Sequence, residues 1–182
     1  YQISQYDLPL VQNAKLSVDN QEIAIIRLHL EEDTAKLTHP HQKNYSLADF
    51  NRSGVPLIEL VTGPVIKDGA TAKKFCQKFQ QILRYLDISD ADMEKGQMRC
   101  EANISLQTPG SFVIEQNEVR PRNNQELNAK VEVKNINSFK AVEKAINYEI
   151  SRQAKILDEA GLIVAETRGW SDSQNITISQ RI

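Results

Sequence analysis

Two glutamates in the middle of predicted strands carry the clearest signal for chemistry in this sequence. Glu101 and Glu132 each alternate with apolar neighbours, and each has a cation two residues away on the same face: Arg99 for the first, Lys130 and Lys134 for the second. One interpretation is a solvated sheet face on which cross-strand ion pairs contribute about 0.2–1 kcal/mol each. The other is a site that binds a cation or a charged substrate.

Two further glutamates favour the binding site. Glu59 lies in an otherwise apolar run over residues 55–61, which is typical of a strand covered on both faces. Glu32 follows an apolar alternation over residues 26–30 and shares its face. A carboxylate on a covered strand is costly unless it is paired or bound to a cation. Four carboxylates that converge on one cavity would suit Mg²⁺, and a phosphate-bearing substrate could then be neutralised by Arg99, Lys134 and Arg168.

Other kinds of site have weaker support. The sequence contains no Walker loop, no GxGxxG and no HExxH, so a nucleotide would not be held by a P-loop or a Rossmann turn. Cys76 and Cys100 make no CxxC pattern, and their apolar surroundings predict small core residues. The stretch His39-Pro40-His41 is typical of a surface loop.

Composition limits the class of protein. The chain has 182 residues, 40% of them hydrophobic and 25% charged, which predicts an ordered globular protein of one domain or two small ones. Its net charge of −2 excludes a strongly basic nucleic-acid binder but not a local basic patch. Two cysteines without a disulfide framework fit a reducing cytoplasm, and no apolar run approaches the ~20 residues of a membrane span.

The elements that must position these side chains follow from hydrophobic periodicity. Helical spacing predicts one helix over residues 69–86 with Asp68 as N-cap, and a second over 138–160 that ends at Gly161. Strand-like patterns occur over residues 22–32, 55–61, 98–106, 130–134 and 162–168, whereas 107–128 has the character of a long polar loop. These patterns predict an α+β fold: an antiparallel sheet packs its apolar face on the helices and leaves a polar face open as a cradle.

The ends of the sequence favour a piece of a longer chain. The first residue is not Met, and residues 175–182 alternate like a strand without a polar tail. We therefore expect residues 1–182 to form a single domain that is part of a larger protein.

Six motifs stand in an order that resembles one family. They are YQISQYD at 1–7, HLEED at 29–33, DFNRSGVPLIE at 49–59, MEKGQMRCEANIS at 93–105, VEVKNINSF at 131–139 and ETR at 166–168. The chain is similar to the B subunits of the aspartyl/glutamyl-tRNA amidotransferases, and the match covers nearly all 182 residues.

The resemblance implies a fold and an activity. The fold would be a cradle similar to that of glutamine synthetase and the guanidino kinases. The activity would be a step in the ATP-dependent conversion of glutamate misacylated on glutamine tRNA, or aspartate on asparagine tRNA, to the amide. The cradle uses Mg²⁺ and ATP to phosphorylate the side-chain carboxylate, and ammonia from glutamine then displaces the phosphate. Partners would be the A and C subunits and the misacylated tRNA, in the cytoplasm and without a membrane.

The same resemblance implies residue roles. Glu32, Glu59, Glu101 and Glu132 match the family's metal-site carboxylates. The expected catalytic contacts to phosphate or substrate carboxylate come from basic side chains, namely Arg52, Arg99, Lys134 and Arg168, of which Arg99 and Lys134 would also bind ATP. Glu101 stands where many members carry Asp, and residues 39–43 and 107–128 diverge from the family pattern.

Some family parts would lie outside this sequence. An N-terminal strand with a Glu-x-His motif would precede residue 1, and helical and tail domains that grip the tRNA would follow residue 182, so the isolated fragment is expected to be inactive. Two alternatives to an enzyme remain at this point. One is a non-catalytic module that docks a tRNA acceptor end or a partner subunit, and the other is a structural scaffold with a solvated polar face.

Overall fold

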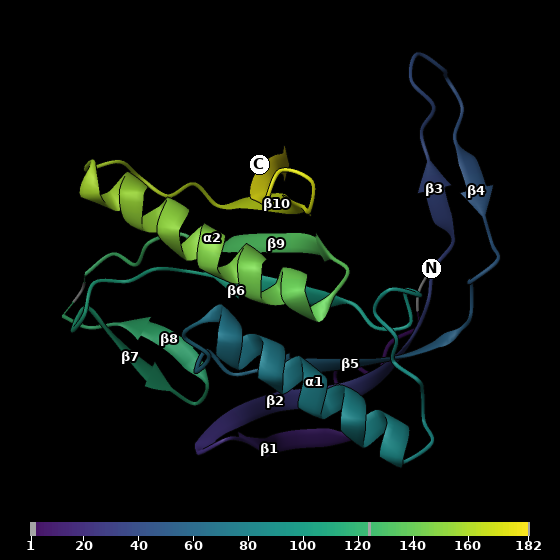
Figure 1. Cartoon of the computed structure of the whole chain (residues 1–182), viewed down its shortest axis with the longest axis horizontal. Helices are drawn as coiled ribbons and strands as arrows, with labels where there is room; N and C mark the ends of the chain where they lie inside the picture. Colours follow the sequence, from purple (N-terminus) through teal and green to yellow (C-terminus); the bar gives the residue numbers. More distant parts are fainter. Residues whose placement is uncertain (1–2, 124, 182) are drawn as a thin grey trace. The chain divides into compact units, whose positions relative to one another are not determined.

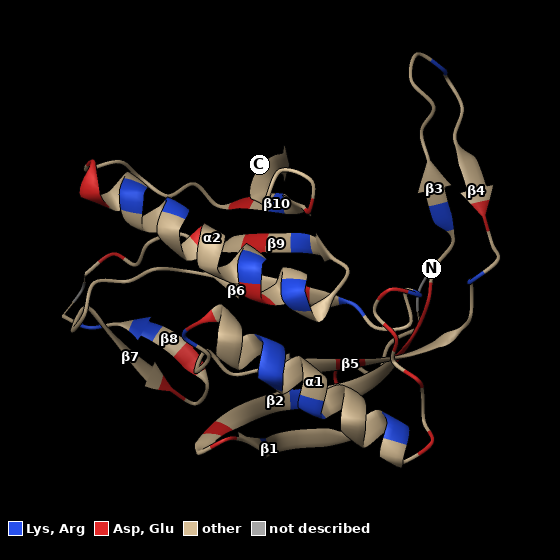
Figure 2. Ribbon diagram, in the orientation of Figure 1, with Lys and Arg blue, Asp and Glu red and all other residues tan. Residues whose placement is uncertain are grey.

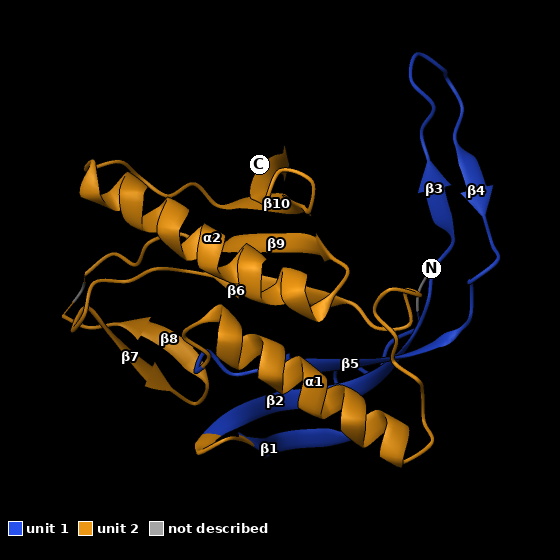
Figure 3. Ribbon diagram, in the orientation of Figure 1, with its two compact units in different colours: residues 1–17, 22–65 blue, residues 18–21, 66–182 orange. Residues whose placement is uncertain are grey.

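The computed structural model describes residues 3–123 and 125–181, which form two compact units (Figure 3). The first unit contains residues 1–17 and 22–65, and the second contains residues 18–21 and 66–182. Within the described residues, neither helix combines the length and the apolar character that crossing a membrane requires.

The first unit is made of strands (Figure 1). Its three-stranded sheet has the order β1-β2-β5, and a separate two-stranded hairpin pairs β3 with β4. The bounds are β1 Val11–Val18, β2 Gln21–Glu32, β3 Lys36–Thr38, β4 Leu47–Asp49 and β5 Pro56–Thr62. Strands β2 and β5 are antiparallel, with His29 opposite Glu59 and Glu32 opposite Pro56.

The second unit combines two helices with a four-stranded sheet of order β11-β10-β9-β6 and a second hairpin, β7–β8. The bounds are α1 Gly69–Tyr85, β6 Cys100–Ile104, β7 Phe112–Glu115, β8 Glu118–Pro121, β9 Val131–Ile136, α2 Phe139–Asp158, β10 Glu166–Ser171 and β11 Ile176–Arg181. Helix α2 packs on this sheet and also on α1. The core between α2 and the sheet contains Val131, Val133, Val142 and Ala145, all fully buried.

Both helices begin where the sequence predicts. The Asp68 carboxylate accepts a hydrogen bond from the Thr71 backbone N–H at 2.8 Å, and the Ser138 hydroxyl accepts one from the Ala141 N–H at 3.1 Å. Helix α1 starts at Gly69, where an added Cβ would collide with the α2 backbone at Glu143. A glycine here therefore lets the two helices approach closely. Lys and Arg residues, blue in Figure 2, occur along both helices.

The α+β fold class is confirmed, but the arrangement of the strands differs from the expected one. The strands form several small sheets instead of one, and β9 and β10 are parallel, because α2 connects them as a crossover. The predicted loop over residues 107–128 contains the hairpin β7–β8. Strand β5 was expected to be covered on both faces, but it is an edge strand with no fully buried residue.

Candidate functional site

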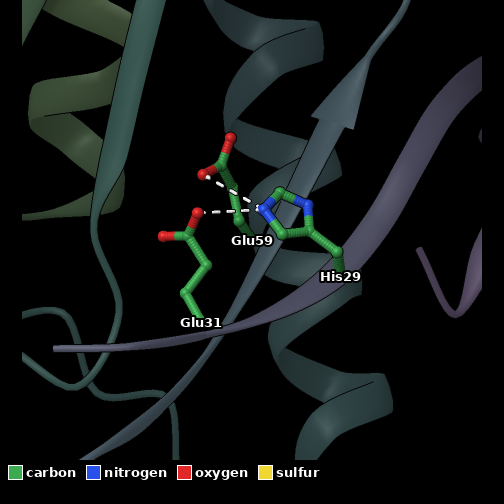
Figure 4. A group of neighbouring side chains, drawn as sticks. All are labelled: His29, Glu31 and Glu59. Atoms are coloured by element: carbon green, nitrogen blue, oxygen red, sulfur yellow. Dashed lines mark hydrogen bonds and ion pairs between the residues drawn. The ribbon is translucent and has the colours of Figure 1, made fainter. Parts of the chain in front are cut away.

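The first unit brings an imidazole and two carboxylates together (Figure 4). His29 and Glu31 lie two residues apart on β2, and Glu59 faces His29 across the β2–β5 ladder, so all three side chains share one face of the sheet. The His29 Nε2 atom is 3.0 Å from a Glu31 oxygen and 3.9 Å from a Glu59 oxygen. We call these three residues the His29 cluster.

The burial of the His29 cluster is uneven. The His29 side chain is fully buried, whereas that of Glu31 is 19% exposed and that of Glu59 is 46% exposed. The carboxylates therefore lie between a buried base and solvent, which gives a ligand a way in. One potential ligand atom from each residue lies within 4.8 Å of the others, a spacing that could hold a metal ion.

Two neighbours support the cluster from the same unit. The Arg27 guanidinium lies 4.2 Å from the centroid of the Tyr6 ring, and one of its nitrogens is 3.7 Å from a Glu59 oxygen. The Tyr6 ring also meets the His29 ring edge-on, with centroids 5.9 Å apart. These contacts restrict the movement of His29 and place one positive charge beside the two carboxylates.

Two buried polar atoms in and beside the His29 cluster have no hydrogen-bond partner among the described residues. They are His29 Nδ1 and Arg27 Nε. If Nε2 carries the His29 proton, it donates to Glu31 and leaves Nδ1 as an unpaired acceptor, which costs about 1–3 kcal/mol. The arrangement therefore is not the one that folding stability alone would favour.

The donor set fits a divalent cation. Mg²⁺ takes oxygen ligands and retains several waters, so Glu31 and Glu59 could supply its protein ligands while His29 hydrogen-bonds to Glu31. A borderline metal could also use the His29 nitrogen.

Glu32 and Glu59 were predicted to face one cavity, and the register does not place them so. Glu32 lies opposite Pro56, three positions along β2 from the residue that faces Glu59, so alternation puts Glu32 and Glu59 on opposite faces of the sheet. Glu31 occupies the expected place beside Glu59 instead. The metal-binding role of Glu32 stays a prediction.

The second unit brings Glu101 and Glu132 together, as predicted for those two residues. The Lys134 ammonium lies between them, 3.4 Å from an oxygen of each. Burial alone would lower the pKa of Lys134, but the charges of Glu101 and Glu132 outweigh it and raise that pKa above its usual value. The Thr167 hydroxyl also donates to Glu132 at 3.1 Å.

A β-bulge in β9 positions the Lys134 side chain. The β6–β9 register shifts between Cys100 and Ala102, so Lys134 and Asn135 together oppose the single residue Glu101. Asn135 has a φ of 61°, the left-handed conformation that such bulges use and that Asn tolerates better than most residues. The bulge sets the position of the Lys134 side chain relative to both carboxylates.

Arg168 lies on the other face of the same sheet. It pairs with Val133 in the β9–β10 register, and its guanidinium donates to Glu166 at 2.6 Å and to the Thr177 hydroxyl at 2.8 Å. It is also 3.7 Å from Glu149 on α2. Lys134 and Arg168 were predicted to neutralise the same phosphate, but the register places Arg168 under α2 and Lys134 on the opposite face.

Arg168 belongs to a polar network beneath α2, which we call the Glu149 network: Glu149, Arg152, Gln153, Glu166, Arg168 and Thr177. Glu149 is fully buried and accepts from Arg152, Gln153 and Thr177. The Glu149 hydrogen bond raises the pKa of Arg152 despite burial. Burial would raise the pKa of Glu166, but hydrogen bonds from Ser179 and Arg168 lower it overall.

The remaining predicted basic residues are Arg52 and Arg99. Arg52 follows β4 in a turn, with its Nε 2.9 Å from an Asp33 oxygen. Arg99 is exposed and directly precedes β6. The predicted convergence of all four carboxylates on one cavity is wrong, because Glu32 and Glu59 lie on opposite faces of the β2–β5 sheet. Glu59 belongs to one unit and Glu101 and Glu132 to the other, so a site shared by those three stays a prediction.

The sequence analysis did not single out His29 or Glu31 as site residues. Their i, i+2 spacing on a strand is a signal that places both side chains on one face. The sequence does not show the pairing register of β2 with β5, which brings Glu59 beside these two residues.

Comparison with known proteins gives a consistent result. The family described as the GatB/GatE catalytic domain matches residues 1–182. A protein of Carboxydothermus hydrogenoformans, named as the B subunit of an aspartyl/glutamyl-tRNA(Asn/Gln) amidotransferase, is 47% identical over 190 aligned positions, which cover 100% of this chain and 36% of that protein. Proteins of the same name from Moorella thermoacetica and Persephonella marina are each 45% identical and also match the whole chain, which covers 37% and 36% of their lengths.

Proposed function

Because the chain belongs to the GatB/GatE catalytic domain family, we propose that it is the catalytic part of an ATP-dependent amidotransferase acting on misacylated tRNA. The family match along the whole of residues 1–182 carries this proposal. The chain spans 36% of the length of its relative from Carboxydothermus hydrogenoformans, so further segments would complete the enzyme.

The proposed substrate is glutamate esterified to glutamine tRNA, or aspartate esterified to asparagine tRNA. Its side-chain carboxylate is a poor electrophile, and phosphorylation by ATP converts it into an acyl phosphate. Ammonia derived from glutamine then attacks the carbonyl carbon, the C–O bond to phosphate breaks, and the amide forms with release of inorganic phosphate.

The carboxylates of this chain suit the binding of Mg²⁺ with ATP. Glu31 and Glu59 would hold the cation in the first unit, and Glu32, Glu101 and Glu132 are further proposed ligands. When bound, Mg²⁺ would neutralise the charge on the phosphate oxygens. His29 would hold Glu31 in place through the contact from its Nε2 atom.

Basic side chains would contact the negatively charged groups of the substrates. The Lys134 ammonium can donate three hydrogen bonds, and the bulge at Asn135 holds it beside Glu101 and Glu132. We propose that Lys134 and the exposed Arg99 bind ATP phosphates, and that Arg52 contacts a phosphate or the substrate carboxylate. Arg168 has no such role here, because its guanidinium lies in the Glu149 network.

The proposal includes partners and a location. The names of the relatives imply an assembly, and we propose the A and C subunits as partners and misacylated tRNA as substrate. A reducing cytoplasm agrees with the two free cysteines.

Calorimetric titration of the purified amidotransferase with a non-hydrolysable ATP analogue, with and without Mg²⁺, tests the proposal. The variants Glu31→Gln and Glu59→Gln should weaken Mg²⁺-dependent binding by about 10–100-fold. Glu22→Gln is the matched control, because Glu22 lies on the same strand β2 as Glu31 and is paired with Lys15 on the exposed surface. Its binding should equal that of the wild type.

The outcomes separate the competing functions. Unchanged binding by Glu31→Gln and Glu59→Gln would remove the His29 cluster from the cation site. Absence of Mg²⁺-dependent nucleotide binding in the wild type, with tRNA binding retained, would instead indicate a non-catalytic docking module.

A further inference from the structure

The second unit contains two free thiols in contact. Cys76 lies on the buried side of α1, and Cys100 is the first residue of β6. Their sulfur atoms are 3.8 Å apart, although 24 positions separate the residues in sequence. Burial of Cys76 agrees with the predicted core role, whereas Cys100 is only partly buried.

The distance between the two sulfurs is within about 2 Å of that in a disulfide. A disulfide has an S–S length of about 2.05 Å, so the two sulfurs need to approach by less than about 2 Å. Both residues belong to the same compact unit, and each side chain already points at the other. Cys100 is the partly exposed residue of the pair, so we expect a small oxidant to reach it first.

We propose that Cys76 and Cys100 form a reversible oxidation site, at which a peroxide converts the two thiols into a disulfide between α1 and β6. Hydrogen peroxide first oxidises the Cys100 thiol to a sulfenic acid and is itself reduced to one water. The Cys76 sulfur then attacks the Cys100 sulfur, the S–OH bond breaks, and a second water leaves as the S–S bond forms. A thiol reductant reverses the change by exchange.

The position of the pair gives the oxidation a consequence. Cys100 directly precedes Glu101, whose carboxylate lies 3.4 Å from Lys134. Closing the S–S bond draws the start of β6 towards α1, so we expect the contact between Glu101 and Lys134 to change. The oxidation site itself does not depend on the proposed enzymatic function.

Peptide mapping tests the site without an activity assay. The purified protein is incubated with increasing hydrogen peroxide, free thiols are blocked with N-ethylmaleimide in denaturant, and trypsin is added without a reductant. A disulfide between Cys76 and Cys100 joins the tryptic peptides 75–78 and 100–122, because trypsin does not cut before Pro121. We expect this joined pair to appear in the wild type, to vanish after treatment with dithiothreitol, and to be absent in Cys76→Ser.

A comparison of folded and unfolded protein shows whether the fold is responsible. The joined peptides should form at least about tenfold faster in the native protein than in urea, because the fold holds the sulfurs in contact. Equal rates would overturn the proposal. Conversion of Cys100 to sulfinic acid in the native wild type without joined peptides would overturn it as well. Both tests use the wild type, so they hold even if Cys76→Ser fails to fold.

Discussion

The His29 cluster and the Glu149 network are both built from carboxylates and basic groups beside a strand, and they differ in how completely their atoms are paired. Glu149 is fully buried and accepts four hydrogen bonds from Arg152, Gln153 and Thr177, at 2.7 to 3.0 Å. In the His29 cluster, Glu31 lies 3.0 Å from His29 and accepts a hydrogen bond from the Ser4 hydroxyl at 3.1 Å, whereas Glu59 lies 3.9 Å from His29 and 3.7 Å from Arg27. A buried nitrogen of His29 has no partner among the described residues.

This difference separates a structural network from a binding site. A buried carboxylate whose lone pairs all accept hydrogen bonds has none left for a ligand. Removing one residue of such a network is costly, because it leaves a buried charge without its partner. The Glu59 carboxylate is 46% exposed and its contacts to Arg27 and His29 are long, so it keeps lone pairs available for a cation. Four substitutions test that distinction, beginning with the largest effect.

The largest effect is expected for Glu149→Ala. The substitution leaves Arg152 and Arg168 with Glu166 as their remaining carboxylate partner, so the free energy of unfolding should fall by about 3–5 kcal/mol. Urea unfolding followed by circular dichroism measures the change. Glu159→Ala is the control at the end of the same helix, where an exposed pair with Lys155 contributes at most about 1 kcal/mol. Equal losses in the two variants would break the comparison.

The next effect is on activity. Glu101→Gln should lower amide formation by the complete amidotransferase at least about 100-fold, because one charge beside Lys134 is lost where the phosphate chemistry is proposed. Urea unfolding should change little, since Glu101 is about half exposed. Glu118→Gln is the control, because it removes the carboxylate partner of the exposed Arg120. This variant should retain wild-type turnover. Wild-type turnover in Glu101→Gln would remove Glu101 from the site.

A smaller effect concerns acid stability. The pKa of Glu166 in the folded protein lies below its usual 4.5, so its contribution to stability is complete above that pH and is lost as the pH falls through the lower folded value. Glu166→Gln should therefore show a shallower loss of stability than the wild type between about pH 4.5 and pH 3. Urea midpoints across this range measure both slopes. Identical slopes would show that the hydrogen bonds from Arg168 and Ser179 do not hold Glu166 ionised.

The smallest effect is expected for the stability of Glu59→Gln. Glu59 is nearly half exposed and lies 3.7 Å from Arg27, so the free energy of unfolding should change by less than about 1 kcal/mol. The unfolding midpoint without metal measures this. A loss as large as that of Glu149→Ala would mean that the His29 cluster is structural, and the contrast between the two regions would disappear.

Local signals in the sequence predicted most of the helices and strands. Asp68 and Ser138 cap α1 and α2. A short side chain with an oxygen atom directly before an amphipathic stripe is enough to predict where a helix begins. The hairpin β7–β8 was missed, since its two-residue turn is Gln116-Asn117, both with positive φ, instead of a sequence with glycine.

The sites were less predictable, because they depend on register. Alternation correctly put Glu101, Glu132 and Lys134 on one face, since each strand there has a clear polar side. It could not tell that Glu59 lies opposite His29, or that Arg168 lies opposite Val133 under α2. A shift of one residue reverses the face of every side chain, and pairing between distant segments decides that shift.

The crossover through α2 gives β9 a temporary role during synthesis of the chain. Its parallel partner β10 follows α2 in sequence, whereas its antiparallel partner β6 precedes it. Until the ribosome has released residues up to Ser171, β9 is therefore an edge strand, with Val131 and Val133 awaiting the remainder of their core. Unpaired edges beside apolar residues promote association between chains. We expect released chains that are truncated within α2 to be the most prone to aggregate and to bind chaperones.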